Sequence, residues 1–121
     1  MPLVEVVHAG LSDELQQRIK RLLKDSVAEE LDCSDADPDS ALKPEDINVR
    51  FRTYGPNDDD EFAVDVLVIA KHFDARADKL DDATGQIRSH LCRNLSDLDI
   101  PMLGVFVTLP VSGWALGYPG D

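Results

Sequence analysis

The sequence predicts an α+β fold built from two βαβ units, and two kinds of periodicity lead to that prediction. Two amphipathic segments, 13–31 and 76–95, repeat their apolar residues with the period of a helix. Segments typical of strands flank them at 2–8, 47–54, 62–71 and 102–109. The order β-α-β, β-α-β supplies four strands, enough for one mixed sheet with both helices on one face.

The first helix has clear boundary signals. Ser12 is a suitable N-cap, and Asp13 and Glu14 suit the positively polarised first turn. Its apolar face comprises Leu15, Ile19, Leu22, Leu23, Val27 and Leu31. The acidic segment 32–46 that follows contains two prolines, so we expect a loop there.

The segment 47–54 alternates between two chemically different faces. One face carries Ile47, Val49, Phe51 and Thr53, and the other carries Asn48, Arg50, Arg52 and Tyr54. This pattern predicts a strand with one apolar face and one polar, cationic face on which no neighbouring acidic residue neutralises the arginines. The second helix has its apolar face at Leu80, Ala83, Ile87, Leu91 and Leu95.

The length suits a single domain over 1–121, with approximate halves 1–55 and 62–121. Two folds share this element order: a ferredoxin-like sandwich, and two unsplit right-handed βαβ units placed side by side. Both leave one face of the sheet without helices. Val4, Val6, Leu67 and Ile69 indicate apolar residues on both faces, so we expect a second copy to cover the open face and the protein to be a homo-oligomer.

Charge and composition narrow the possible partners. The chain has 24 acidic and 12 basic residues, a formal net charge of −12, which repels nucleic acids and anionic membranes. An anionic substrate would therefore need a local cluster of cations. We see neither a membrane-spanning apolar run nor a signal peptide. Cys33 and Cys92 do not make a disulfide framework, so we expect a cytoplasmic protein.

Several short motifs resemble those of a known family. Met1-Pro2-Leu3-Val4 leads into a short strand, Gly10, Ser12-Asp13-Glu14 and an amphipathic helix, with Val49-Arg50 in the second strand and Gly113-Trp114 and Gly117 in the tail. This arrangement resembles the tautomerase superfamily, which includes 4-oxalocrotonate tautomerase, macrophage migration inhibitory factor, 5-carboxymethyl-2-hydroxymuconate isomerase and the 3-chloroacrylic acid dehalogenases. The resemblance spans the chain and implies the long form with two βαβ units, which assembles as a homotrimer.

The resemblance also implies a catalytic role for Pro2. In the superfamily the initiator methionine is removed, and the proline nitrogen becomes a secondary amine that acts as a general base. Burial and nearby cations lower the pKa of such an amine toward neutrality, where it can move a proton between two carbons of a substrate. While Met1 remains attached, the nitrogen of Pro2 is an amide and has no such chemistry.

Four cations are candidates for binding a substrate carboxylate. Arg50 corresponds to a carboxylate-binding arginine of 4-oxalocrotonate tautomerase, and Arg52 shares its strand face. A guanidinium can contact a carboxylate at two places, although pairing with Asp or Glu across a subunit contact is the alternative. Lys71 and Arg76 fall where the dehalogenases carry cationic binding residues, with a solvated surface as the alternative for Arg76.

Two aromatic residues, Tyr54 and Trp114, are expected to wall an apolar pocket around the amine, with core or interface positions as the alternative. The chain also departs from the family. Leu11 replaces the arginine that follows the glycine in 4-oxalocrotonate tautomerase, and the tail has no acidic residue before Asp121 to match the glutamate of the dehalogenases. The missing glutamate counts against hydrolytic dehalogenation.

No metal or organic cofactor is expected, because the acidic loop lacks the glycine of a calcium site and the three histidines are scattered. The sequence therefore predicts a cofactor-independent tautomerase or isomerase that acts on a small, anionic, unsaturated or 2-keto acid. The alternatives are a non-catalytic oligomeric or small-molecule-binding domain of the same fold, and a ferredoxin-like binding module.

Overall fold

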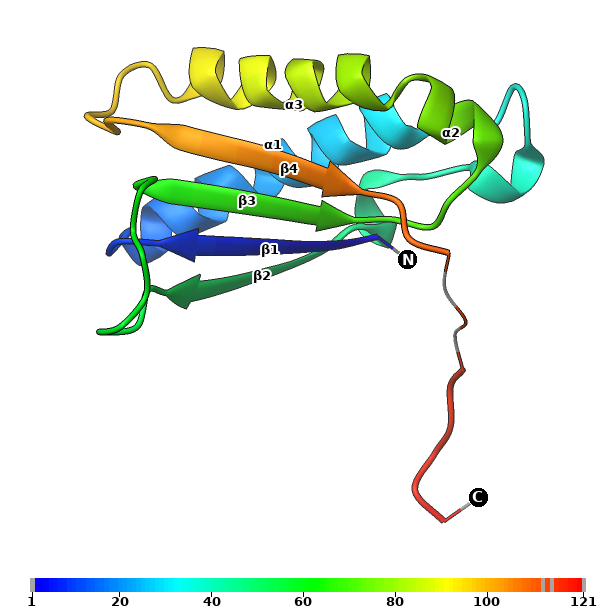
Figure 1. The fold of residues 1–121 in the computed structure, drawn as a ribbon, viewed down its shortest axis with the longest axis horizontal. Coiled ribbons are helices and arrows are strands. Elements are labelled where there is room, and N and C mark those ends of the chain that lie inside the picture. Colours follow the sequence, from blue (N-terminus) through cyan, green and yellow to red (C-terminus); the bar gives the residue numbers. More distant parts are fainter. Residues whose placement is uncertain (1, 112, 114, 121) are drawn as a thin grey trace.

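The computed structural model describes residues 2–111, 113 and 115–120, and its core is a four-stranded mixed sheet (Figure 1). The strands are β1 (Leu3–His8), β2 (Asn48–Thr53), β3 (Val64–Ile69) and β4 (Leu103–Thr108), in the order β2-β1-β3-β4. β1 pairs in parallel with β2 and antiparallel with β3, and β3 pairs in parallel with β4. The predicted fold class is confirmed.

The strand order also decides between the two folds that the sequence left open. Within each half, the two strands joined by a helix are direct neighbours and run parallel. A ferredoxin-like sandwich would place another strand between them. The structure therefore consists of two unsplit βαβ units, which join through the antiparallel pairing of β1 with β3.

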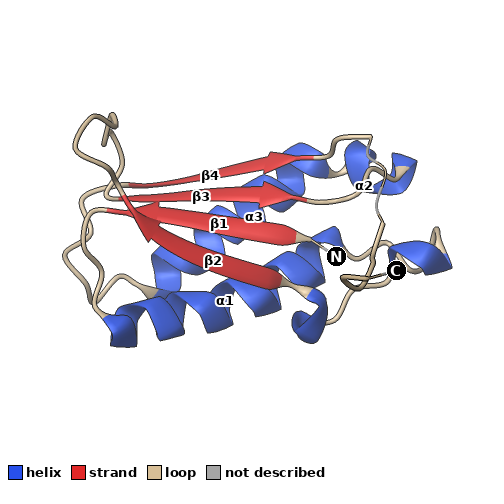
Figure 2. Ribbon diagram, turned by 90° about the horizontal axis from the view of Figure 1, so that it is seen from below, coloured by secondary structure: helices blue, strands red, loops and turns tan. Residues whose placement is uncertain are grey.

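Helices α1 (Asp13–Leu31) and α3 (Leu80–Asn94) cover one face of the sheet, as Figure 2 shows from below. The predicted bounds of the first helix are correct, and the side chain of Ser12 accepts a hydrogen bond from the backbone nitrogen of Leu15 at 3.2 Å. The loop over 32–46 contains two single-turn 3₁₀ helices, η1 (Pro38–Ser40) and η2 (Pro44–Asp46).

The second helix differs from the prediction of one segment over 76–95. A short helix, α2 (Asp74–Asp78), precedes α3, and Lys79 lies between them with φ −109° and ψ 15°, outside the helical region. The ammonium group of Lys79 donates a hydrogen bond to the carbonyl of Asp32 at 2.6 Å. This contact with the end of α1 coincides with the break, which apolar periodicity does not reveal.

The core lies between the sheet and the helices. Its fully buried side chains come from alternate positions of the strands and from one face of each helix; they include Val4, Val6, Val64, Val66, Val68, Ile19, Leu23, Leu31, Ile87 and Leu91. Val4 and Val6 therefore face the helices, whereas Leu67 and Ile69 lie on the opposite, uncovered face at half-buried positions. No helix in the described part of the chain is long and apolar enough to cross a membrane.

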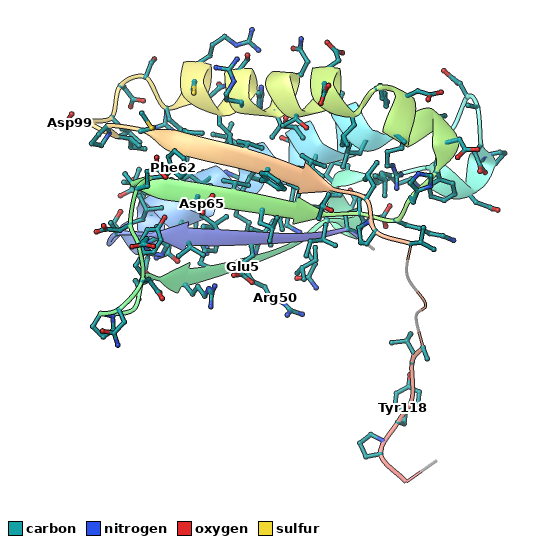
Figure 3. The ribbon with its side chains drawn as sticks, in the orientation of Figure 1. Glu5, Arg50, Phe62, Asp65, Asp99 and Tyr118 are labelled. Carbon is teal, nitrogen blue, oxygen red and sulfur yellow. The ribbon has the colours of Figure 1, made fainter. Side chains whose placement is uncertain are left out.

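The uncovered face carries both apolar and charged side chains. Strand register places Arg50, Glu5, Leu67 and Phe106 in one row across the four strands. Phe106 is 67% exposed, which is unusual for a large aromatic residue in a strand. Figure 3 shows Glu5 and Arg50 on the side of the sheet away from the helices. The face is therefore suited to contact with another protein surface.

His8, the last residue of β1, anchors the turn into α1. Its side chain is 3% exposed, and Nδ1 accepts hydrogen bonds from the backbone nitrogens of Gly10 (3.1 Å) and Leu11 (2.9 Å). These two donors require an unprotonated Nδ1, so the neutral ring with its proton on Nε2 fits this site. Burial lowers the pKa of His8 below its ordinary value of 6.5.

We predict that protonation of His8 destabilises the fold. Because the pKa is lowered in the folded state, the unfolded chain binds the proton more readily, and stability is lost as the pH falls below 6.5. The variant His8→Asn keeps an acceptor oxygen but does not titrate. Urea unfolding between pH 8 and pH 5 should show wild type losing stability relative to this variant at the acidic end, whereas parallel curves would contradict the prediction.

Candidate functional site

Pro2 lies in a small cavity at the start of the central strand. The residue is buried immediately before β1, and its carbonyl accepts a hydrogen bond from the backbone nitrogen of Asn48 at 3.0 Å. The cavity has a volume of about 90 Å³ and is lined by Pro2, Asp39, Leu42, Lys71, Phe73 and Arg76. We call it the Pro2 pocket. It combines two cations, one carboxylate and apolar walls around the residue predicted to be catalytic.

Besides Pro2, the lining residues come from the loop that contains η1, from the segment after β3 and from α2. Asp39 belongs to η1, and its backbone nitrogen is fixed by the carboxylate of Asp37 at 3.0 Å. Lys71 and Phe73 follow the end of β3, with the Lys71 ammonium 5.2 Å from the centre of the Phe73 ring. This distance suits a cation–π contact. Arg76 belongs to α2.

Arg76 is buried rather than solvated. It is 2% exposed, it lines the pocket, and its guanidinium donates hydrogen bonds to three backbone carbonyls. Desolvation lowers the pKa of Arg76, and the nearby Cys33 and Asp32 oppose that effect. A guanidinium keeps its proton even so, so a fixed positive charge lies beside Pro2. The solvated-surface alternative for Arg76 is wrong, because its charge is satisfied inside the protein.

Arg50 and Arg52 lie elsewhere. They project from the uncovered face of the sheet, whereas Pro2 continues the alternation of Val4 and Val6 on the helix-covered face. Neither arginine lines the Pro2 pocket of its own chain. Arg52 forms an ion pair with Glu5 of β1 at 2.9 Å, so for this residue pairing with a carboxylate, the alternative to binding an anionic ligand, is observed within one chain. Arg50 has no ion-pair partner among the described residues.

Tyr54 is at the other end of the sheet from Pro2, because it follows β2 whereas Pro2 lies beside the first residue of that strand. Its hydroxyl donates to the carbonyl of Phe62 at 2.9 Å. Desolvation, with Asp65, Asp60 and Asp58, raises the pKa of Tyr54. The tyrosine lines a second cavity of about 530 Å³ with His8, Ala9, Gly10, Thr53, Gly55, Pro56, Asp58 and Asp60.

The second cavity is larger than the Pro2 pocket but less suited to an acidic substrate. Its charged lining residues are the carboxylates Asp58 and Asp60, and it includes no lysine or arginine. We therefore place the candidate site at Pro2, where the cations are. Trp114, the other aromatic residue predicted to wall the site, lies outside the described residues.

Sequence reasoning missed Asp39 as a pocket residue. The acidic composition of 32–46 indicated a solvated loop, and Asp39 was considered there only as part of an incomplete calcium motif. The signal that could have identified it is Pro38, which starts the 3₁₀ turn that brings Asp39 to the pocket. Within the described residues, no group of three or more His, Cys, Asp or Glu side chains is arranged to hold a metal ion.

The chain is similar to known proteins in structure, but its sequence matches no known family. No protein-family model matches the sequence, and no curated protein matches it. Among solved structures, Leishmania major MIF2 superposes with a TM-score of 0.60 and 20% identity, over 94% of this chain and 93% of that chain. This structure, and those of fused 4-OT and malonate semialdehyde decarboxylase, are of tautomerase-superfamily proteins.

This chain has the tautomerase fold. A fused 4-OT asymmetric trimer superposes with a TM-score of 0.62 and 11% identity, over 98% of this chain and 94% of that one. Malonate semialdehyde decarboxylase superposes with a TM-score of 0.62 and 10% identity, over 97% and 92%. The resemblance predicted from Pro2 and the element order is thus confirmed at the level of the fold.

We predict that Tyr54 supports the fold and does not contribute to chemistry at Pro2. The substitution Tyr54→Phe removes the bond to the Phe62 carbonyl and should lower the free energy of unfolding by about 0.5–1.5 kcal/mol. Turnover that depends on Pro2 should not change in the folded variant. Urea unfolding and steady-state kinetics on one preparation test both parts; a loss of turnover at unchanged stability would return Tyr54 to the site.

Proposed function

We propose that the protein is a proline-based tautomerase or isomerase that moves a proton on a small unsaturated or 2-keto acid. The observation that carries this proposal is the Pro2 pocket, in which a buried proline at the start of a strand meets Lys71 and Arg76. The tautomerase fold supports the proposal, since the neighbouring structures are of tautomerase-superfamily proteins.

The amine of Pro2 would act as the base once Met1 has been removed. Its burial and the fixed charge of Arg76 both disfavour the ammonium form, and they lower the pKa of the amine. A neutral amine takes a proton from one carbon of the substrate and returns it to another. The cations of the pocket stabilise the dienolate that forms between the two transfers.

Assembly as a homotrimer is part of the same proposal. The uncovered sheet face, with Phe106 67% exposed, would be covered by other copies of the chain. In the tail that follows β4, Val111 and Leu116 are also exposed, at 92% and 83%. Trimeric fused 4-OT structures are among the proteins of the same fold. In such an assembly, Arg50 of one copy would complete the carboxylate site of another.

A second candidate reaction, decarboxylation or hydration of a small oxo acid, is favoured by one observation, the presence of Asp39 in the lining of the Pro2 pocket. A carboxylate beside an electrophilic carbon can take a proton from a water molecule, whose oxygen then adds to that carbon. The similar structure of malonate semialdehyde decarboxylase is described as having decarboxylase and hydratase activities. Release of carbon dioxide from 3-oxopropanoate, measured beside ketonisation of phenylenolpyruvate, separates this reaction from tautomerisation.

A non-catalytic oligomeric or ligand-binding role is the remaining alternative, and a cytoplasmic location remains a prediction. Both cysteines in the chain are free, Cys33 buried and Cys92 exposed, which suits a reducing compartment.

We predict that the purified protein lacks Met1 and that the amine of Pro2 is essential. Intact mass spectrometry should show the loss of one methionine residue. Pro2→Ala keeps a primary amine, so turnover of phenylenolpyruvate or 2-hydroxymuconate should fall without disappearing. A preparation that retains Met1 and still turns over either substrate at the full rate would reject the proline mechanism.

We predict that Arg50→Ala removes a charge-assisted carboxylate contact worth about 1.5–3 kcal/mol, a loss of about 10- to 150-fold in kcat/KM. Arg21→Ala, which removes an exposed arginine of α1, is the matched control and should have little effect. Kinetics and oligomeric mass are measured on both variants. Unchanged turnover together with a weakened trimer would show that Arg50 pairs with a carboxylate at the subunit contact instead.

We predict a stable trimer at micromolar concentration. Apolar side chains such as Leu67 and Phe106 on the uncovered face favour burial, which stabilises association. Sedimentation equilibrium should give three times the monomer mass of 13.4 kDa. Phe106→Asp should shift the equilibrium toward monomer, and a wild-type protein that sediments as a monomer would contradict this assembly.

A further inference from the structure

Three segments that are distant in sequence meet around the side chain of Arg76, which is hydrogen-bonded to all three. Two of these segments contribute Asp39 and Lys71 to the lining of the Pro2 pocket. Nε of Arg76 donates to the carbonyl of Leu31, the last residue of α1, at 2.8 Å. Nη1 donates to the carbonyl of Lys71, after β3, at 2.8 Å, and Nη2 donates to the carbonyl of Ser40 in η1 at 2.9 Å.

Two of these hydrogen bonds hold the backbone at or next to the charged residues Asp39 and Lys71 of the pocket. Ser40 directly follows Asp39, so the bond to its carbonyl holds the turn that presents the Asp39 carboxylate. The bond to the Lys71 carbonyl holds the backbone from which the Lys71 side chain extends. Arg76 therefore sets the spacing of Asp39 and Lys71 around Pro2.

The two cations of the pocket differ in their availability to a ligand. Arg76 is 2% exposed, and three of the five N–H groups of its guanidinium are used by backbone carbonyls. Cζ of the guanidinium also lies over the Phe73 ring, 4.9 Å from its centroid. Lys71 is exposed, and its ammonium has no hydrogen-bond or ion-pair partner within the described residues.

From these observations we infer that Arg76 is a positioning residue that holds the backbone around the Pro2 pocket, and that, of the two cations of the pocket, Lys71 and not Arg76 contacts the substrate carboxylate. The inference rests on the proposed function for the identity of the ligand, a small 2-oxo acid. It rests on the hydrogen bonds alone for the role of Arg76. A buried charge is retained at low cost where carbonyl oxygens satisfy it, as they do here.

The test compares Arg76→Lys and Lys71→Met with Arg18→Met as the control. A lysine keeps the charge of Arg76 but has no planar fork that can reach three carbonyls. Lys71→Met removes an ammonium while keeping an unbranched side chain over Phe73. Arg18 is a matched arginine of α1 that contacts Asp97 and the carbonyl of Asn94, away from the pocket.

Three readouts are taken on each variant. Kinetics with phenylenolpyruvate give kcat and KM, and NMR titration with pyruvate gives a dissociation constant that does not depend on turnover. Amide hydrogen exchange reports the order of the turn, through the backbone nitrogens of Ser40, Ala41 and Leu42, which bond to Asp37, Pro38 and Asp32.

For Arg76→Lys we expect kcat to fall by about tenfold or more with KM within about threefold, and faster exchange at residues 40–42. For Lys71→Met we expect KM and the pyruvate dissociation constant to rise by about tenfold, with exchange unchanged. Arg18→Met should lower stability without moving either kinetic constant in the folded protein. A larger KM for Arg76→Lys with unchanged exchange would overturn the inference, because it would place the carboxylate on Arg76.

If the proposed function is wrong, the three measurements give a different set of results. If wild type neither turns over phenylenolpyruvate nor binds pyruvate, the proposed substrate class and the role of Lys71 are rejected. Faster exchange at residues 40–42 in Arg76→Lys would still support Arg76 as the residue that holds the pocket, and unchanged exchange would reject that role too.

Discussion

The interior position of β1 is the constraint on which the rest of the structure depends. β1 begins at Leu3 and is hydrogen-bonded on both sides, to β2 and to β3. Leu3 pairs with Asn48 on one side and with Ile69 on the other. The start of the chain is therefore held between two neighbouring strands, and Pro2 is buried rather than frayed.

Charge is distributed unevenly between the two ends of the sheet. The chain has a net charge of −12, and Asp58 and Asp60 line the cavity at the end where β1 and β2 finish. At the opposite end, Lys71 and Arg76 lie beside Pro2. An acidic protein that attracts an acidic substrate needs this local reversal, since the overall charge repels anions at long range. The contrast explains why the smaller cavity is the better candidate site.

Local sequence signals predict the helices and strands well, but they do not reveal features that depend on contacts between distant residues. The Ser12 cap and the apolar period predicted the first helix with its correct bounds, because both signals lie within the helix itself. The break at Lys79 depends on a bond to Asp32, forty-seven residues away in sequence, and no pattern around Lys79 reveals it. Strand order likewise depends on the long-range pairing of β1 with β2, which the periodicity of the sequence does not reveal.

The candidate site shows the same division. Pro2 and the cations Lys71 and Arg76 were identified in the sequence, and the structure brings all three into one pocket. The burial of Arg76 could not be predicted, because its three acceptors are backbone carbonyls that carry no sequence signal. Arg50 and Arg52 were predicted from their strand face, but that face is turned away from Pro2 within one chain.

We propose that the nitrogen of Pro2 is an amine whose environment keeps it neutral near physiological pH. NMR titration of protein labelled with ¹⁵N-proline tests this proposal, because it observes the nitrogen atom itself. We predict one proline nitrogen that titrates as an amine, with a pKa below the range of an ordinary terminal amine. A Pro2 nitrogen that behaves as an amide, or that titrates well above that range, would contradict the assignment of Pro2 as the base.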